Sequence, residues 1–538
     1  MIDARAGAGA GAGALAAVIL LLAAASAISS GSSTAFASPA ASAISTSTSS
    51  GRSAASASRG PSATSASHHP ARRQVQPAGR PNIVFILTDD LAWNLIQYMP
   101  HVLALAQRGA TFSNYFVTDS LCCPSRSSIF SGRYPHDTGV FTNGGADGGF
   151  LVFHDQGEER TTFATALQAA GYRTAMMGKY LNGYEPSFTE AGPKPYIPPG
   201  WNEWDVAGNA YSEFNYTLNQ NGQLFRYGHR PQDYLTDVLS KRGTAFVRHA
   251  ARAHSPFFME IATFAPHIPY TPAPRDVNDF PGLTAPMGPA FNMQNINAPS
   301  WLADLPALNA LQLSSLDRAF RLRAQSLQAV DRMLASLENT LAARGLLQNT
   351  YIVFSSDNGY HMGEHRLTAG KLTAFDTDIK VPLIVAGPGV PASQTLPQMT
   401  ENIDLNPTFS DIGNAVIPPS VDGRSLLPLL RGQTVNDWAN AILVEHHGPD
   451  FNASDPDNPP IASGNPTSYE AIRTTNAVYV EYNDGETEYY DLTSDPNELD
   501  NTVATLSPVQ QSGLHNALIA LENCHDGASC STAGRVGP

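Results

Sequence analysis

Short apolar segments that alternate with amphipathic helices are the feature that most constrains the fold of this chain. Residues 83–87 form an unbroken, β-branched run, which is typical of a strand covered on both faces. Similar strands are expected at residues 174–177, 257–263, 351–354 and 381–385. Amphipathic helices are expected at residues 101–108, 162–170 and 314–344, and a glycine follows each of the last two. This alternation predicts an α/β fold in which helices sandwich a large, mostly parallel sheet.

The N-terminal residues indicate export. Residues 15–22 are apolar and are followed by small residues, so residues 1–37 are predicted to be a signal peptide. The apolar run is short for a membrane span, so we expect no stable membrane insertion, with an uncleaved anchor as the alternative. Residues 38–80 are rich in Ser, Ala and Pro and are predicted to be a disordered spacer. The protein is therefore expected to be secreted or held in the cell envelope.

The rest of the chain is predicted to form two domains, because 538 residues exceed what one core usually serves. The α/β pattern extends over residues 81–428. Residues 429–538 are expected to form a smaller domain of antiparallel sheet, with a hairpin around the Asn-Asp-Gly turn at 483–485. A closing helix near residues 507–523 is expected to pack on this sheet.

Two other segments allow a structural prediction. Cys524 and Cys530 are two of only four cysteines and flank a turn-prone stretch, so they are expected to form one disulfide in an oxidising compartment. Residues 185–299 are rich in Pro, Gly and aromatic side chains. Apart from the strand that leads to His267, this segment is predicted to form long loops across the functional edge of the sheet.

The charge of the chain limits its partners. A net charge of -15 argues against nucleic acid, whose phosphates require a basic surface. For the same reason, a site for an anionic small molecule must create its positive potential locally. A few converging cations or a metal ion would supply that potential.

Polar side chains follow the ends of four predicted strands. They are Asp89 and Asp90, Lys179, His267, and the pair Asp357 and Asn358. Ligands of open parallel sheets gather at the carboxyl ends of the strands, so these residues are predicted to converge. Lys371 follows the last pair closely and is expected to return to the same cleft.

The acidic members of this set suggest a metal ion. Carboxylate and amide oxygens suit Ca²⁺ or Mg²⁺ and not zinc. Asp89 and Asp90 are adjacent and would repel each other unless a divalent cation lies between them. Taken singly, the same residues also fit a helix cap, a plain turn or solvated loops. Their common place at strand ends favours one shared site.

The segment that starts at Cys122 carries the strongest chemical signal. Pro124 suits the first turn of a helix, which places Cys122 at the helix entrance, where free N–H groups favour an anion. Arg126 lies four residues after Cys122 and so on the same helical face, where it can stabilise an oxyanion. The structural alternative is a buried Cys-Cys pair before an ordinary helix.

These residues together resemble a known family. Cys122-x-Pro-Ser-Arg126 is similar to the signature of type I sulfatases, and the other motifs stand in the order seen in that family. The resemblance extends from about residue 80 to the C-terminus. It implies an alkaline-phosphatase-like fold with residues 81–428 as the sulfatase catalytic domain. Segments 178–184 and 197–201 are most similar to N-acetylglucosamine-6-sulfatases, extracellular glucosamine-6-sulfatases and related arylsulfatases.

The resemblance implies specific chemistry. A formylglycine-generating enzyme would oxidise Cys122 to 3-oxoalanine (formylglycine), whose hydrate attacks the sulfur of a sulfated sugar or aryl sulfate ester. Ca²⁺, or alternatively Mg²⁺, would be held by Asp89, Asp90, Asp357, Asn358 and an oxygen of modified Cys122. Arg126 would hold the hydrate, while Lys179, His267 and Lys371 bind sulfate oxygens. His267 or Lys371 would protonate the departing alcohol.

One departure from the family pattern and two alternatives stay open at this point. Many sulfatases carry a histidine two residues after the counterpart of Lys179, where this chain has Leu181 followed by Asn182. The base for the last step is therefore unassigned. A phosphate or phosphonate monoester hydrolase would keep the same fold and metal. A non-catalytic binder of sulfated glycans would leave Cys122 unoxidised.

Overall fold

The computed structural model describes residues 79–538 except 191, 450–454, 456, 459–460 and 538. The predicted signal peptide, and the predicted spacer up to residue 78, lie outside the described residues. Among the helices that are described, none is long and apolar enough to cross a membrane. Both sheets belong to one compact unit, so the boundary expected after residue 428 stays a prediction.

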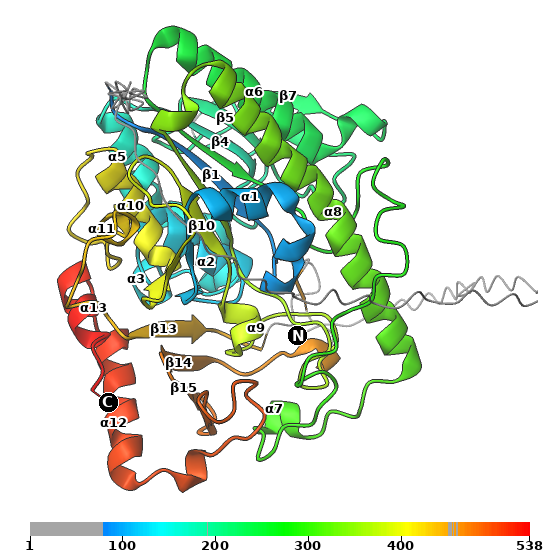
Figure 1. Ribbon diagram of the computed structural model, residues 1–538, viewed down its shortest axis with the longest axis vertical. Helices are drawn as coiled ribbons and strands as arrows, with labels where there is room; N and C mark the ends of the chain where they lie inside the picture. Colours follow the sequence, from blue (N-terminus) through cyan, green and yellow to red (C-terminus); the bar gives the residue numbers. More distant parts are fainter. Residues whose placement is uncertain (1–78, 191, 450–454, 456, 459–460, 538) are drawn as a thin grey trace, which may run out of the picture. The chain divides into compact units, whose positions relative to one another are not determined.

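A ten-stranded sheet forms the centre of the molecule, in the order β11-β2-β10-β9-β1-β8-β4-β5-β6-β7 (Figure 1). Its five central strands are parallel, which confirms the predicted parallel core. They are β9 (Thr350–Ser356), β1 (Asn82–Thr88), β8 (Phe257–Ala262), β4 (Arg173–Lys179) and β5 (Glu203–Ala207).

The outer strands add antiparallel pairs to this core. The strand expected at residues 381–385 forms as β10, but it runs antiparallel to β9. The outer strands are β2 (Ala110–Phe112), β6 (Thr217–Gln220), β7 (Gln223–Arg226), β10 (Leu383–Ala386) and β11 (Gln394–Leu396). A separate two-stranded pair joins β3 (Tyr115–Phe116) to β12 (Thr400–Glu401).

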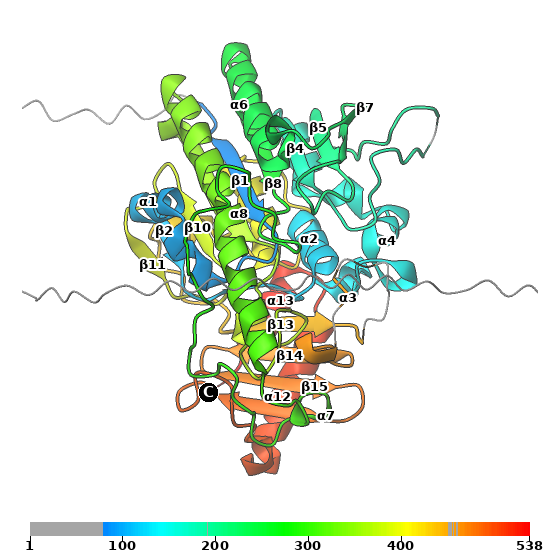
Figure 2. The same ribbon diagram turned by 90° about the vertical axis from the view of Figure 1, so that its right-hand side faces the viewer.

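Helices cover both faces of the large sheet, which explains why β1 is apolar without alternation. Val84 of β1 joins the apolar cluster under α1, α6 and α8, whereas Phe85 joins the cluster under α2, α5 and α10. Figure 2 shows α8 and α2 on opposite sides of β1. The first group is α1 (Pro100–Arg108), α6 (Leu235–Ala253) and α8 (Ala310–Ala343); the second is α2 (Cys122–Ser131), α5 (Phe163–Ala169) and α10 (Leu405–Ile412).

The prediction of long loops over residues 185–299 is wrong for its central part. This segment contains β5, β6, β7 and the 19-residue helix α6. In α6, Leu235, Val238, Leu239 and Phe246 are buried at helical spacing, so the pattern was amphipathic. The Pro- and Gly-rich flanks concealed it. Between β8 and α7 the segment is irregular, as expected.

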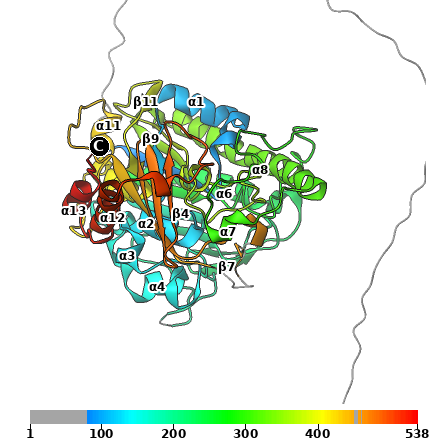
Figure 3. The same cartoon turned by 90° about the horizontal axis from the view of Figure 1, so that it is seen from below.

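A second sheet of four antiparallel strands follows in the sequence, which confirms the smaller antiparallel sheet. Its order is β13 (Ala441–His446), β14 (Tyr469–Thr474), β15 (Ala477–Tyr482) and β16 (Thr487–Asp491). The expected hairpin is β15–β16, and the expected helix is α12 (Pro508–Glu522), which packs against β13 and β14 (Figure 3). The shorter helices are α3 (Pro135–Thr138), α4 (Gly149–Asp155), α7 (Ser300–Ala303), α9 (Asp376–Ile379) and α11 (Leu427–Leu430).

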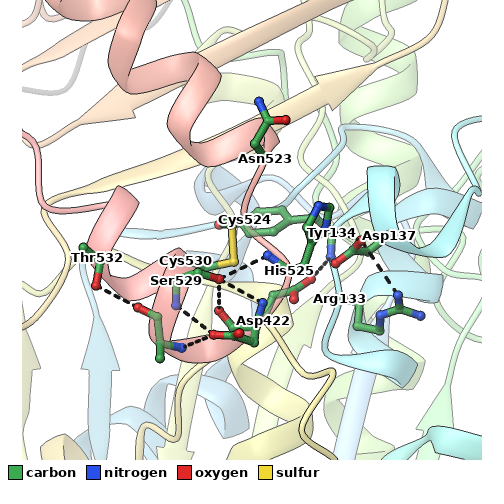
Figure 4. Close-up of a disulfide and its surroundings, with 12 residues drawn as sticks. Arg133, Tyr134, Asp137, Asp422, Asn523, Cys524, His525, Ser529, Cys530 and Thr532 are labelled. Atoms are coloured by element: carbon green, nitrogen blue, oxygen red, sulfur yellow. Dashed lines mark hydrogen bonds and ion pairs between the residues drawn. A yellow bond between two sulfur atoms is a disulfide. The ribbon is translucent and has the colours of Figure 1, made fainter.

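The disulfide expected between Cys524 and Cys530 is present. It joins the end of α12 to the last helix, α13 (Gly527–Ala533), as Figure 4 shows. Asp526 caps α13 by accepting hydrogen bonds from the backbone N–H groups of Ala528 and Ser529. The disulfide therefore holds α13 against the end of α12, beside the small sheet.

Candidate active site

All nine predicted site residues converge at the carboxyl end of the parallel strands. Asp89 and Asp90 follow β1, Lys179 ends β4, and His267 follows β8. The nine side chains come from six separate stretches of the sequence, yet each is at most 4% exposed. They are Asp89, Asp90, Cys122, Arg126, Lys179, His267, Asp357, Asn358 and Lys371.

Cys122 is the first residue of α2 and lies at the centre of this group. Its Sγ is 3.2 Å from Asp89 Oδ1 and 3.0 Å from Lys371 Nζ. Burial, with added repulsion from Asp457 and Asp89, raises the pKa of the thiol well above its usual value. Burial therefore disfavours the thiolate form of an unmodified Cys122.

Arg126 connects helix α2 with the ends of three strands. Its Nε donates to Asp357 Oδ2 at 2.8 Å, and its Nη1 donates to the backbone carbonyl of Lys179 at 3.2 Å. Its Nη2 lies 3.9 Å from Asp89 Oδ1 and has no hydrogen-bond partner among the described residues. Because Arg126 is one turn after Cys122, the guanidinium is held beside the sulfur.

Two buried lysines each pair with one aspartate of the Asp89–Asp90 turn. Lys179 Nζ lies 2.7 Å from Asp89 Oδ2, and Lys371 Nζ lies 2.7 Å from Asp90 Oδ1. Burial alone would lower the pKa of both ammonium groups, but the surrounding carboxylates outweigh it and raise both pKa values well above the usual one. Both lysines are therefore cationic, and Lys371 lies 3.0 Å from the Cys122 sulfur.

The oxygen atoms of this site fit a divalent cation. Ligand atoms of Asp89, Asp90, Cys122 and His267 all lie within 4.8 Å of one another. Asp90 Oδ2 and Asn358 Oδ1 are buried but have no hydrogen-bond partner among the described residues. Buried polar atoms are normally paired, so these two oxygens indicate a missing ligand. The hard donors present suit Ca²⁺ or Mg²⁺.

His267 is held between backbone and carboxylates. Nδ1 lies 2.7 Å from the backbone carbonyl of Ile268, and Nε2 lies 2.5 Å from Asp457 Oδ1. Burial opposes the charged ring, but Asp457 and Asp90 outweigh it and raise the pKa of His267 above its ordinary value. The raised pKa favours the protonated ring, in which Nε2 donates to Asp457.

Three residues at the site had not been predicted. Asp457 also lies 3.0 Å from Lys371 Nζ, and its Oδ2 accepts a hydrogen bond from Asn143 Nδ2 at 2.8 Å. Arg323 of α8 donates to the backbone carbonyl of Asp90. Asp457 and Asn143 flank no predicted strand, so no pattern marked them. Arg323 was visible as one arginine within the apolar face of a predicted helix.

Leu181 and Asn182 occupy the place of the family's extra histidine. Leu181 packs in the apolar cluster, whereas Asn182 Nδ2 lies 3.3 Å from the hydroxyl of Tyr211. Asn182 Oδ1 is buried without a partner among the described residues. The ring of Tyr211 in turn lies 5.0 Å from Lys179 Nζ. Asn182 thus contacts the wall of the site and presents an amide there.

Comparisons with known proteins agree with this geometry. A model of the sulfatase family matches residues 81–415, and a model of the N-sulphoglucosamine sulphohydrolase C-terminal region matches residues 363–523. Human N-acetylglucosamine-6-sulfatase is 37% identical over 487 residues, which cover 85% of this chain and 87% of that protein. The arylsulfatase of Volvox carteri is 30% identical over 526 residues, covering 85% of this chain and 76% of the other.

Solved structures share the fold. One is a complex of a protein with its substrate D-glucosamine-2-N,6-O-disulfate, with a TM-score of 0.67, 24% identity, and coverage of 82% of this chain and 97% of the other. Another is a phosphonate monoester hydrolase of Agrobacterium radiobacter, with a TM-score of 0.64, 21% identity, and coverage of 82% and 96%. The resemblance expected from the Cys122 motif is thereby confirmed, and the chain belongs to the sulfatase family of sulfuric ester hydrolases.

Proposed function

We propose that this sulfatase removes the 6-O-sulfate group from N-acetylglucosamine-type sugars of sulfated glycans, with aryl sulfates as the alternative substrate class. The observation that carries the proposal is the buried cluster in which the Cys122 sulfur contacts Lys371 and Asp89, while Lys179 pairs with the same aspartate. The identity with N-acetylglucosamine-6-sulfatases over most of the chain supports the sugar class.

Two groups would complete this site. Formylglycine at position 122, formed by a formylglycine-generating enzyme, would supply an aldehyde hydrate as nucleophile, and Ca²⁺, with Mg²⁺ as the alternative, would supply positive charge for the bound sulfate. The Cys122 sulfur stands in for the hydrate oxygens. Asp89, Asp90, Asp357 and Asn358 would hold the metal ion, and the unpaired oxygens of Asp90 and Asn358 support this assignment.

The side chains of the protein would then bind and orient the ester. Lys179 and Lys371 are cationic, buried and adjacent to position 122, so they would hold sulfate oxygens. Arg126 is fixed by Asp357 and would orient the hydroxyl groups at position 122. Because these side chains are buried, solvent screens their charges less than it would screen charges at the surface.

His267 is the residue best placed to protonate the departing alcohol. Asp457 and Asp90 outweigh the effect of burial and raise the pKa of its ring, which favours the protonated form that a general acid needs. Lys371 is the alternative, because its Nζ is 3.0 Å from the Cys122 sulfur. For the step that restores the aldehyde, Asn182 would orient a hydroxyl group but is a poor base.

The protein is proposed to act outside the cytoplasm, in secreted or envelope-bound form. The Cys524–Cys530 disulfide supports an oxidising compartment. Relatives at 36% and 35% identity include proteins described as extracellular sulfatase homologues, from Drosophila melanogaster and Caenorhabditis elegans.

Two measurements test the proposal. The mass of the peptide that contains Cys122, from protein produced with a formylglycine-generating enzyme, should show an aldehyde in place of the thiol. Rates should then be compared on N-acetylglucosamine 6-sulfate, on N-acetylgalactosamine 6-sulfate as the epimeric control, and on matched aryl sulfate and aryl phosphate. A preference for the phosphate would favour the phosphonate-hydrolase alternative, whose fold this chain shares. An unmodified cysteine with no turnover would favour a glycan binder.

A further inference from the structure

Arg323 is a buried cation that no carboxylate neutralises among the described residues. It lies in the middle of α8 and is 0% exposed. Its Nη2 donates to the backbone carbonyl of Asp90, while Nε and Nη1 have no hydrogen-bond partner among the described residues. Burying an arginine without an ion pair is costly, so its position calls for an explanation beyond packing.

The backbone of Asp90 has an unusual conformation. Its φ is +66°, in the left-handed region that few residues other than Gly, Asn and Asp adopt. In an extended strand, adjacent side chains point to opposite faces. The turn at Asp90 breaks this alternation, so that oxygens of Asp89 and Asp90 lie within 4.8 Å of each other and of Cys122 Sγ. The left-handed turn thus creates the paired carboxylates.

This turn is held from both sides of the Asp90 residue. Its backbone N–H donates to Asp357 Oδ1 at 3.1 Å, and its carbonyl accepts from Arg323. The Arg323 guanidinium also stacks on the ring of Tyr360, with its central carbon 4.0 Å from the ring centroid. Tyr360 comes two residues after Asn358, and its hydroxyl lies 2.8 Å from that of Tyr270. One side chain therefore contacts two of the three segments that carry predicted metal ligands, the one with Asp90 and the one that continues from Asn358 to Tyr360.

From this geometry we propose that Arg323 is a positioning residue for the metal centre. It acts through the Asp90 peptide and the Tyr360 ring and contacts neither metal nor sulfate. The inference rests on the proposed metal site and adds a residue to it. Partners that orient metal ligands typically contribute 10- to 100-fold to metal affinity.

Calcium affinity of EDTA-treated protein, measured by isothermal titration calorimetry, tests this role. Arg323→Met should raise the Kd for Ca²⁺ by roughly 10- to 100-fold. Arg323→Lys, which keeps the charge but loses the fork, should raise it less, and it serves as the readout if the methionine variant does not fold. Arg332→Met is the matched control on the same helix, because Arg332 pairs with Asp276 and not with the Asp90 turn. The Kd of this variant for Ca²⁺ should stay within twofold of the wild-type value.

The outcomes separate this inference from the function on which it rests. Each variant's thermal unfolding without metal is recorded, so that a general loss of stability is distinguished from a change in Kd. A folded Arg323 variant with the wild-type Kd would overturn the positioning role alone. If wild-type protein bound neither Ca²⁺ nor Mg²⁺, the proposed metal site would be wrong and this inference with it.

Discussion

Both sheets of this sulfatase bury carboxylates, but the two regions treat them differently. In the small sheet, Glu488 Oε1 accepts a hydrogen bond from Tyr482 at 2.6 Å, and Oε2 accepts one from Tyr490. At the edge of the large sheet, Asp90 Oδ2 and Asn358 Oδ1 have no hydrogen-bond partner among the described residues, and the ammonium groups of Lys179 and Lys371 pair with Asp89 and Asp90 in the same cluster. Burial of a charge therefore does not by itself mark a functional site. Buried oxygens that lack a hydrogen-bond partner and share a cluster with buried cations do mark such a site.

The largest expected effect separates activity from stability at the large sheet. Cys122→Ala should lower kcat by roughly 10⁴- to 10⁶-fold, as expected for loss of a nucleophile, while the unfolding temperature changes little. Cys123→Ala is the matched control, because Cys123 is equally buried but belongs to the apolar cluster. That variant should lose stability and keep its kcat. Comparable activity of both variants would remove Cys122 from the mechanism.

A pH effect is expected from a third kind of buried carboxyl group. Glu260 in β8 is fully buried, neither oxygen has a partner among the described residues, and burial raises its pKa to about 8. The folded state then keeps a proton that the unfolded state loses above about pH 4.5. The contribution of Glu260 to the free energy of unfolding is fully present below that pH and declines as the pH rises toward 8.

Glu260→Gln should abolish this decline. Between pH 5 and pH 8, the unfolding free energy of the wild type should fall by roughly 4 kcal/mol more than that of the variant. Urea denaturation at both pH values measures it, with the exposed Glu185→Gln as control for the lost charge. The same difference at pH 5 and pH 8 would show that Glu260 is ionised in the folded protein.

The paired carboxylate of the small sheet should act on stability alone. Glu488→Ala leaves the buried hydroxyls of Tyr482 and Tyr490 without their acceptor, which should cost roughly 2 to 4 kcal/mol of unfolding free energy. The kcat of the folded fraction should be retained. A tenfold lower kcat at full folding would instead show that the small sheet controls the site, and Tyr469 offers a route, because its hydroxyl donates to the carbonyl of Leu372 beside Lys371.

Periodicity and strand ends predicted the parallel sheet, and the nine candidate residues do meet at its carboxyl edge, for a physical reason. Parallel strands place their carboxyl ends at the same edge of a sheet. Because β1 and β9 are parallel neighbours, Asp89 and Asp357, which follow them, lie close together. Helix α6 was missed because Pro and Gly in its flanks outweighed a sound helical pattern. The left-handed turn at Asp90 could not be predicted either, since it depends on Arg323 from a distant helix.

Asp457 illustrates the limit most clearly, because it reaches the site from the segment between β13 and β14. Its Oδ1 contacts His267 Nε2 and Lys371 Nζ, the two atoms proposed to bind sulfate oxygens or the leaving group. A sulfate group that uses these donors must compete with the carboxylate and is repelled by its charge. Asp457→Asn keeps the size of the side chain and removes that charge.

This substitution should therefore strengthen anion binding. The competitive inhibition constant of inorganic sulfate should fall by about three- to tenfold, which corresponds to roughly 1 kcal/mol. Asn143→Asp is the reciprocal change, because it places a second negative charge next to Asp457 Oδ2 and should weaken sulfate binding. If Asp457→Asn instead weakened inhibition by sulfate, the carboxylate would be acting through the orientation of His267, and its charge would be part of the binding site.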